Sequence, residues 1–219
     1  MAVKTLKVDE DILNANDKLA DALRRRFDAS QVFVMNLMSS PGAGKTSVIL
    51  RIIQALSDKV KIGVIEGDIA SDVDARKIAK SDVDVVQINT SGACHLDANM
   101  ILSASETLGL DGKQFLIIEN VGNLVCPAEF RLGENVKVMI LSIPEGHDKP
   151  LKYPLMFTES AALILNKIDL LPYTDFDMEE LQKTVTAMNP GIRIFPLSAK
   201  TGEGVGKFVD WLEQNMGAK

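Results

Sequence analysis

The sequence predicts an α/β protein of three layers, in which helices cover both faces of a doubly wound, mainly parallel sheet. From Val32 onward, short runs of aliphatic and β-branched residues alternate with longer helical patterns. A loop that contains two glycines separates the first such run from the helical pattern SVILRIIQAL. This alternation is typical of parallel strands that are joined by right-handed crossovers.

The composition indicates a single domain with a small extension. The chain has 219 residues, of which 46% are hydrophobic and 25% are charged, and one core can grow to roughly 250 residues before it splits. The net charge of -6 argues against nucleic acid as a partner, because phosphate-backbone binding needs a basic face. There is no signal-peptide pattern and no long uncharged apolar stretch. We therefore expect a cytoplasmic protein without a membrane partner.

An amphipathic helix is predicted from Asp9 to Phe27. Apolar residues recur there at helical spacing, namely Ile12, Leu19, Leu23 and Phe27. We expect this helix to pack on the main domain. The chain is accordingly divided into an N-terminal helical extension at residues 1–30 and a nucleotide-binding domain, with an embedded metal site, at residues 31–219.

About seven strands are predicted in the main domain. They cover residues 32–38, 60–66, 84–88, 114–119, 136–142, 161–166 and 192–198. Doubly wound sheets bind their ligands at the carboxyl ends of the strands. The loops that follow these runs are therefore the places to look for chemistry.

The loop after the first strand, Ser39-Ser40-Pro41-Gly42-Ala43-Gly44-Lys45-Thr46, has the pattern of a phosphate-binding P-loop. Glycines let backbone N–H groups face phosphate oxygens, Lys45 supplies positive charge, and the Thr46 hydroxyl can bind Mg²⁺. Ser39 occupies the position at which this pattern usually has its first glycine. The residues expected to bind nucleotide at this loop are Gly42, Ala43, Gly44, Lys45, Thr46 and Ser47.

Two acidic segments follow later strands. Glu119-Asn120-Val121-Gly122 places a carboxylate that can orient Mg²⁺ three residues before a glycine N–H that can meet the γ-phosphate. Asp68, in the segment Glu66-Gly67-Asp68, can hold Mg²⁺ or the attacking water. The individual roles of Asp68, Asp72 and Asp74 stay open, and capping of a helix by Asp68 or Asp72 is an equal alternative. The expected catalytic residues are Lys45, Asp68, Glu119 and Gly122.

Two further segments resemble the guanine boxes of the GTPase superfamily. Asn166-Lys167-Ile168-Asp169 ends an apolar run, and in that family the carboxylate accepts hydrogen bonds from the N1 and amino groups of the base. Ser198-Ala199-Lys200 resembles the last box, whose backbone meets the guanine oxygen. The resemblance implies GTP and GDP as ligands, bound in part by Asn166, Lys167, Asp169, Ser198, Ala199 and Lys200.

Cys94, His95 and Cys126 form a candidate metal site, because the loops that carry them leave the third and fourth predicted strands at the nucleotide edge. Two thiolates and an imidazole suit Ni²⁺ or Zn²⁺. The alternative is that both cysteines are small buried hydrophobes and that His95 caps a helix. His147 is a weaker candidate ligand. Lys149 or Lys152 could reach the nucleotide of a partner subunit.

Several strings together closely resemble the hydrogenase nickel-insertion GTPases, the HypB family of SIMIBI-type P-loop GTPases. They are SSPGAGKT, EGD, CHLDA, ENVGNLVCP and NKIDL, and they span nearly the whole chain. The resemblance implies that Cys94, His95 and Cys126 are metal ligands. It also implies a GTP-favoured homodimer that passes nickel, with other maturation proteins, to a hydrogenase precursor. This sequence contains neither the amino-terminal cysteine motif nor the histidine-rich tract of some members.

The functional hypothesis is a slow GTP hydrolase whose nucleotide state controls its metal site through the loop that Gly122 and Cys126 share. We expect slow hydrolysis because no glutamine follows Gly122 and no arginine is clearly placed as a finger. One alternative is a regulatory GTP-binding switch that acts by protein docking without a metal. Others are a small-molecule P-loop kinase and a urease-type nickel GTPase, although the latter family's Cys-Pro-His string is missing.

Overall fold

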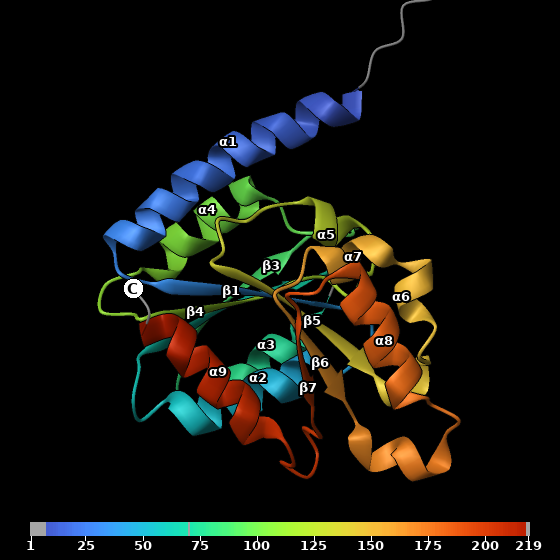
Figure 1. Ribbon diagram of the computed structural model, residues 1–219. Coiled ribbons are helices and arrows are strands. Elements are labelled where there is room, and N and C mark those ends of the chain that lie inside the picture. Colours follow the sequence, from blue (N-terminus) through green and yellow to red (C-terminus); the bar gives the residue numbers. More distant parts are fainter. Residues whose placement is uncertain (1–7, 70, 218–219) are drawn as a thin grey trace, which may run out of the picture.

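The computed structural model describes residues 8–69 and 71–217 (Figure 1). Residues 1–7 of the predicted extension and residues 218–219 of the predicted domain lie outside the described residues. Within the described chain, no helix has both the length and the apolar character needed to cross a membrane.

One sheet of seven strands runs through the centre of the molecule, and all of its pairings are parallel. The strand order β3-β2-β4-β1-β5-β6-β7 places β1 in the middle. Each predicted strand is confirmed to within two residues at either end. The strands are β1 (Phe33–Ser39), β2 (Ile62–Asp68), β3 (Asp84–Asn89), β4 (Phe115–Glu119), β5 (Val136–Ser142), β6 (Ala162–Asn166) and β7 (Arg193–Pro196).

Helices cover both faces of this sheet, which confirms the predicted three layers (Figure 1). On one face lie α2 (Lys45–Leu56), α3 (Val73–Ala79) and α9 (Val205–Gly217). On the other lie α1 (Val8–Ala29), α4 (Ala98–Leu108), α7 (Pro154–Thr158) and α8 (Met178–Met188). The remaining short helices are α5 (Cys126–Glu129), η1 (Ile143–Glu145), α6 (Lys149–Lys152) and η2 (Ile168–Tyr173).

The apolar side chains form one core cluster on the first face and two on the second. Alternation along β1 explains this division, since Met35 and Leu37 face one side while Val34 and Met38 face the other. Every residue of β1 is buried, as expected for a central strand covered on both faces.

The predicted N-terminal helix is confirmed as α1, and it packs against α4 and the sheet. Leu23 and Phe27 are fully or almost fully buried in the same cluster as residues of β1, β2 and β4. Ile12, however, is 52% exposed, so the apolar stripe predicted from the sequence is buried only in the carboxyl-terminal half of the helix. The division of the chain at residue 30 stays a prediction.

Replacing Phe27 with alanine is expected to lower the free energy of unfolding by about 3–5 kcal/mol, because a large buried aromatic side chain leaves a cavity. Phe27 is 0% exposed and belongs to a cluster that includes the central strands. Urea denaturation followed by circular dichroism measures this loss, and Ile12→Ala on the exposed part of the same helix is the control. A loss below about 1 kcal/mol for Phe27→Ala would contradict the packing of α1 as part of the core.

Candidate functional site

The predicted phosphate loop connects β1 to α2 at the carboxyl edge of the sheet. Gly42 and Gly44 have positive φ angles of 75° and 104°, which side chains rarely adopt. A Cβ atom at Gly44 would also lie 2.5 Å from Asn166 Nδ2. Helix α2 begins directly after Gly44, so its first N–H groups are available to an anion.

The serine at the unusual first position of this loop is accommodated. Ser39 is fully buried at the end of β1, and its Oγ donates to the carbonyl of Ser40 at 2.6 Å. The same Oγ accepts a hydrogen bond from Lys45 Nζ at 3.2 Å. Ser39 thus holds the side chain of Lys45 across the loop, which a glycine could not do.

The acidic residues that were predicted to act on Mg²⁺ and water line one pocket with Lys45. Its volume is about 340 Å³, and it includes Glu66, Asp68, Asp74, Glu119 and Gly122. Thr46 Oγ1 donates to Glu119 Oε1 at 3.0 Å. Among the described residues, the buried Oε2 atoms of Glu66 and Glu119 have no hydrogen-bond partner. Two orphaned carboxylate oxygens beside a threonine hydroxyl are the donor set that a hard divalent cation prefers.

The electrostatics of this pocket agree with a cation between the carboxylates. Burial raises the pKa of Glu66 to about 8, and the neighbouring Glu119 adds to the shift. Burial also raises the pKa of Glu119 to about 7, against the effect of Lys45. The pKa of Lys45 is lowered by burial, which the surrounding acids oppose. Positive charge placed between the two carboxyls would restore their ionised forms.

Without a divalent cation, the free energy of unfolding is expected to fall as pH rises from about 4.5 to about 8. Both carboxyls keep their protons in the folded protein over a range where an ordinary glutamate of pKa 4.5 has lost its own. The unfolded chain therefore binds fewer protons, and stability declines with pH. We expect a loss of about 2–4 kcal/mol, since one pKa unit corresponds to about 1.4 kcal/mol and partial solvation reduces the full effect.

Urea titrations at pH 5 and pH 8 in the presence of a chelator measure this difference. A Glu66→Gln, Glu119→Gln double variant is the control, because it lacks both titrating groups and should lose most of the dependence. Equal unfolding free energies for the wild-type protein at the two pH values would show that burial does not raise the pKa values of these carboxyls.

The segments that resemble guanine boxes lie together beside the phosphate loop. They line a second pocket of about 380 Å³, whose walls are Gly44, Ser47, Asn166, Lys167, Asp169, Leu170, Ala199 and Lys200. Asn166 Nδ2 donates to the carbonyl of Ala43 at 2.9 Å, and Asn166 Oδ1 accepts from Ala199 N at 3.0 Å. Asp169 Oδ1 accepts from Ser198 Oγ at 2.6 Å. The structure thus brings together all the residues predicted for nucleotide recognition.

Cys94, His95 and Cys126 also meet, with all their candidate ligand atoms within 4.8 Å of one another. The two Sγ atoms are 3.0 Å apart, and His95 Nδ1 is 3.6 Å from Cys94 Sγ. The His95 ring stacks on Phe130 with centroids 3.8 Å apart, and burial lowers its pKa. A lowered pKa favours the neutral imidazole that binds metals.

The alternative prediction, that both cysteines are small buried hydrophobes and that His95 caps a helix, is wrong. Cys94 is exposed and Cys126 is half-buried, so neither is an enclosed hydrophobe. Asp97, not His95, caps α4, because its Oδ1 accepts from Met100 N at 2.8 Å. Two soft sulfur ligands and an imidazole, of which Cys94 is exposed and the other two are half-buried, suit binding of Ni²⁺ or Zn²⁺.

The remaining sequence candidates lie elsewhere or in other roles. His147 Nδ1 accepts from Asp177 N at 3.2 Å, and His147 does not belong to the group of candidate ligands among the described residues. Lys152 pairs with Asp148, and Lys149 lies over the ring of Tyr153. Action of these lysines across a dimer stays a prediction.

Among the described residues, the predicted helix capping by Asp68 or Asp72 is not seen either. Asp72 holds the N-cap position of α3 without a capping bond and pairs with Arg76, while Asp68 Oδ1 accepts from Ser71 N at 2.7 Å in the preceding turn.

Sequence reasoning did not identify the residues that are far from the phosphate loop in the sequence but contact it in the structure. Glu145 accepts hydrogen bonds from Ser40 Oγ, Ser142 N and Ser142 Oγ. Lys167, which was predicted to belong to the nucleotide site, also supports the loop, because its Nζ donates to the carbonyl of Gly42 at 2.7 Å. No local pattern around Glu145 indicates this contact, since Ser40 lies 105 positions away. Asn36 gave a clearer sequence signal of a buried polar contact, because it is a polar residue inside the mostly apolar strand β1.

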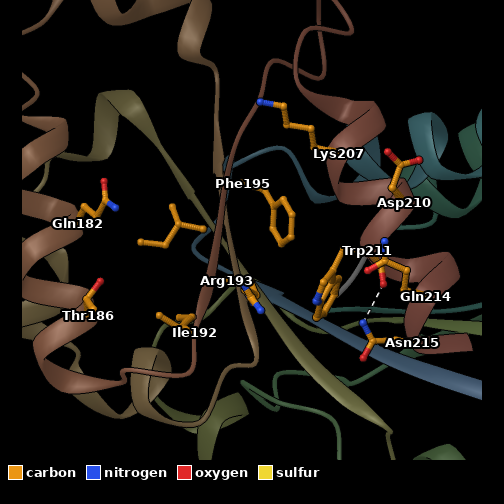
Figure 2. Close-up of a pocket in the computed structure, with 11 residues that line it drawn as sticks. Gln182, Thr186, Ile192, Arg193, Phe195, Lys207, Asp210, Trp211, Gln214 and Asn215 are labelled. Carbon is orange, nitrogen blue, oxygen red and sulfur yellow. Dashed lines mark hydrogen bonds between the residues drawn. The ribbon is translucent and has the colours of Figure 1, made fainter. Parts of the chain in front are cut away.

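A larger pocket, of about 590 Å³, lies away from the nucleotide edge of the sheet, along β7 between α8 and α9 (Figure 2). The rings of Phe195 and Trp211 form its centre, with Lys207 and Asp210 beside them. Trp211, predicted as core, packs against the core but is only partly buried because it lines this pocket. None of the predicted site residues, all of which are described, belongs to its lining.

The fold and the loop after β1 define a nucleotide-binding protein of the P-loop class. Residues 33–196 match the family model described as CobW/HypB/UreG, nucleotide-binding domain. The chain is 49% identical to the hydrogenase maturation factor HypB of Azotobacter chroococcum mcd 1, over 99% of this chain and 71% of the relative. With these matches, the chain belongs to the HypB family of hydrogenase maturation factors.

Two further relatives agree with this assignment. HypB of Escherichia coli (strain K12) is 48% identical over 96% of this chain and 72% of the relative. The crystal structure of HypB from Helicobacter pylori in complex with nickel is 38% identical, superposes with a TM-score of 0.87, and covers 92% of this chain and 95% of that one.

Proposed function

We propose that this chain is a GTP-hydrolysing metallochaperone that delivers nickel during maturation of [NiFe]-hydrogenase. The observation that carries the proposal is the cluster of Cys94, His95 and Cys126 beside a P-loop nucleotide site. The donor set suits nickel, and a similar protein of known structure was crystallised with nickel. Zn²⁺ fits the same three ligands and is the alternative occupant.

GTP and GDP are the proposed nucleotides. Gly42 to Ser47 would surround the phosphates, and the pocket of Asn166, Asp169 and Ala199 would receive the base. Thr46, Asp68 and Glu119 would hold Mg²⁺, whose positive charge would offset the charge that develops on the phosphates. Lys45 would contact the outer phosphates, and the N–H of Gly122 would meet the γ-phosphate.

Hydrolysis is proposed to act as a timer. Asn123, which follows Gly122, donates to the carbonyl of Cys94 at 3.3 Å and so contacts the metal loop. It therefore does not supply the water-orienting amide of faster GTPases, and we expect slow turnover. GTP would order the loops of Asp68 and Gly122 and favour a homodimer, and hydrolysis would release the subunits. Ile69, Val73 and Val125, each about half exposed beside these loops, are apolar surface that a second subunit could cover.

The proposed partners are other maturation proteins and the hydrogenase precursor. A regulatory switch that docks proteins without a metal is the second candidate, favoured by the same exposed apolar residues. Delivery to urease is less well supported, because the Cys-Pro-His string is missing from this sequence.

A single-turnover experiment tests the function directly. Protein loaded with one Ni²⁺ and GTP–Mg²⁺ is mixed with a chromogenic chelator, while phosphate release and subunit association are followed in parallel. Nickel release and dimer dissociation should follow phosphate release. If nickel is released at the same rate with a non-hydrolysable analogue, hydrolysis does not act as the timer. If the protein releases phosphate but cannot be loaded with nickel, the docking switch is favoured.

Asp169→Asn is expected to weaken GTP binding about 100-fold, because two hydrogen bonds from the base to a charged acceptor contribute roughly 1.5 kcal/mol each. Xanthosine triphosphate, which presents an acceptor in place of the amino group, should bind the variant better than GTP. Competition with a fluorescent nucleotide measures both affinities. Ser198→Ala is the control, since it removes the hydroxyl that donates to Asp169 but keeps the carboxylate. Unchanged preference in Asp169→Asn would place the base elsewhere.

A further inference from the structure

The three candidate metal ligands lie on two separate segments, since Cys94 and His95 are on a loop and Cys126 is the first residue of α5. Cys126 follows Gly122 by four residues, so the chain itself connects this ligand to the loop that would sense the γ-phosphate. Cys94 and His95 lie on the loop between β3 and α4. The exposed bond from Asn123 to the Cys94 carbonyl is one link between the two segments, and a buried link would hold them more firmly.

A fully buried asparagine supplies that connection. Asn120 follows β4 directly, is 0% exposed, and donates its backbone N–H to the carbonyl of Leu37 in β1 at 3.0 Å. Its Oδ1 accepts from Leu96 N at 3.2 Å and from Val121 N at 2.9 Å. One side-chain oxygen thus holds the residue after His95 and the residue before Gly122.

The orientation of this amide is fixed by its surroundings. Because two backbone N–H groups point at one atom, that atom must be the oxygen, and the Nδ2 group must donate. It donates to Asn36 Oδ1 at 3.2 Å, and Asn36 Nδ2 in turn donates to Glu134 Oε1 at 3.2 Å. A buried, satisfied chain of this kind resists rotation, because a turned amide would leave several groups unpaired.

Both loops held by Asn120 also touch the proposed nucleotide pocket. The Leu96 side chain lies so close to Gly67 that a Cβ atom there would be 2.8 Å from it, and Gly67 lies between the pocket acids Glu66 and Asp68. Gly122 packs on the phosphate loop, where its own Cβ would be 3.0 Å from Pro41 Cα. A shift of either loop on nucleotide exchange therefore reaches the other through the Asn120 oxygen.

We propose that Asn120 is a positioning residue that transmits the nucleotide state to the Cys94–His95 half of the metal site. This inference rests on the proposed function, in which GTP and GDP bind at the P-loop and nickel binds at Cys94, His95 and Cys126. Asn120 contacts neither ligand itself. It couples the two sites because its side chain bonds to the backbone of both loops.

The test measures nickel affinity of the full chain with GDP and with a non-hydrolysable GTP analogue, both with Mg²⁺, using Ni²⁺ alone as the probe. We expect the two affinities of the wild-type protein to differ about fivefold or more, the usual size of coupling between sites. In Asn120→Ala the ratio should fall toward one, since the buried bridge is lost and only the exposed bond from Asn123 to the Cys94 carbonyl still joins the two loops.

Asn36→Ala is the matched control. Asn36 is also 0% exposed and belongs to the same chain of hydrogen bonds, but its removal leaves both bonds to the Asn120 oxygen in place. Both variants should lose stability, and only Asn120→Ala should lose the affinity ratio. If Asn120→Ala does not fold, Asn120→Ser replaces it, because its short side chain cannot span both loops.

The possible outcomes distinguish a failure of the proposed nucleotide control from a failure of the proposed role of Asn120. Equal affinities in the wild-type protein would overturn both the nucleotide control of the metal site and this inference. A wild-type difference that survives undiminished in Asn120→Ala or Asn120→Ser would overturn the inference alone. A loss of the ratio in Asn36→Ala as large as in Asn120→Ala would also overturn it, by showing a general effect of the buried chain.

Discussion

Replacing Cys94 and Cys126 together with alanine is expected to weaken nickel binding at least about 1000-fold, while nucleotide binding stays within about twofold. Loss of an outer partner of a metal site alone costs about 10–100-fold, and this variant removes two of the three candidate ligands. Calorimetric titration of Ni²⁺ under reducing conditions measures the loss. Titration of GDP on the same sample shows whether the nucleotide site is intact.

The stability of this variant should change little. Cys94 is exposed and Cys126 only half-buried, and surface substitutions usually alter the free energy of unfolding by less than about 0.5 kcal/mol. His95→Ala and His147→Ala form a matched pair, because His95 lies in the cluster while His147 is held by Asp177 and Glu180. Retained nickel affinity in the double cysteine variant, or equal losses in the two histidine variants, would remove the metal site from its proposed place.

Lys45→Ala is expected to lower the rate of GTP hydrolysis by about 100–1000-fold, the usual cost of removing one preorganised group that stabilises transition-state charge. The Lys45 ammonium lies in the pocket with Glu66 and Glu119 and is held by Ser39 Oγ. Its loss leaves the acids without their nearest positive charge, so nucleotide affinity should fall as well. Phosphate release at saturating GTP measures the rate separately from binding.

Lys59→Ala is the control for this substitution. Lys59 pairs with Glu213 on the surface, and neither lines the nucleotide pockets. It should hydrolyse GTP at the wild-type rate. Hydrolysis by Lys45→Ala within threefold of the wild-type rate would mean that the loop after β1 does not contact the reacting phosphates.

Much of the fold and of the nucleotide edge could be predicted because the signals are local. Each strand lies in a short run that is rich in aliphatic and β-branched residues, and Gly42 to Thr46 identify the phosphate loop from adjacent residues alone. The parallel order of the strands then brings the loops after β1, β4 and β6 to one edge of the sheet. For the same reason Cys94 and Cys126, which are 32 positions apart, could be expected to meet.

The contacts that support these loops could not be predicted, because they join distant polar residues that have no pattern of their own. Glu145 reaches Ser40 over 105 positions, and Asn166 reaches Ala43 over 123. The Asn36–Asn120 pair is separated by 84 positions. The prediction that the apolar stripe of α1 is buried was wrong at Ile12. Helical periodicity identifies the apolar face of a helix but does not show how far the core extends beneath it.

The central claim is that nucleotide state controls a Cys/His metal site, and calorimetric titration of Ni²⁺ into the wild-type protein tests it most directly. The titration is done in a reducing, non-chelating buffer, first with GDP and then with a non-hydrolysable GTP analogue. We predict at most one Ni²⁺ per subunit and affinities that differ between the two nucleotides. Identical affinities would contradict the control of the site by nucleotide, and no binding in either state would contradict the metal site itself.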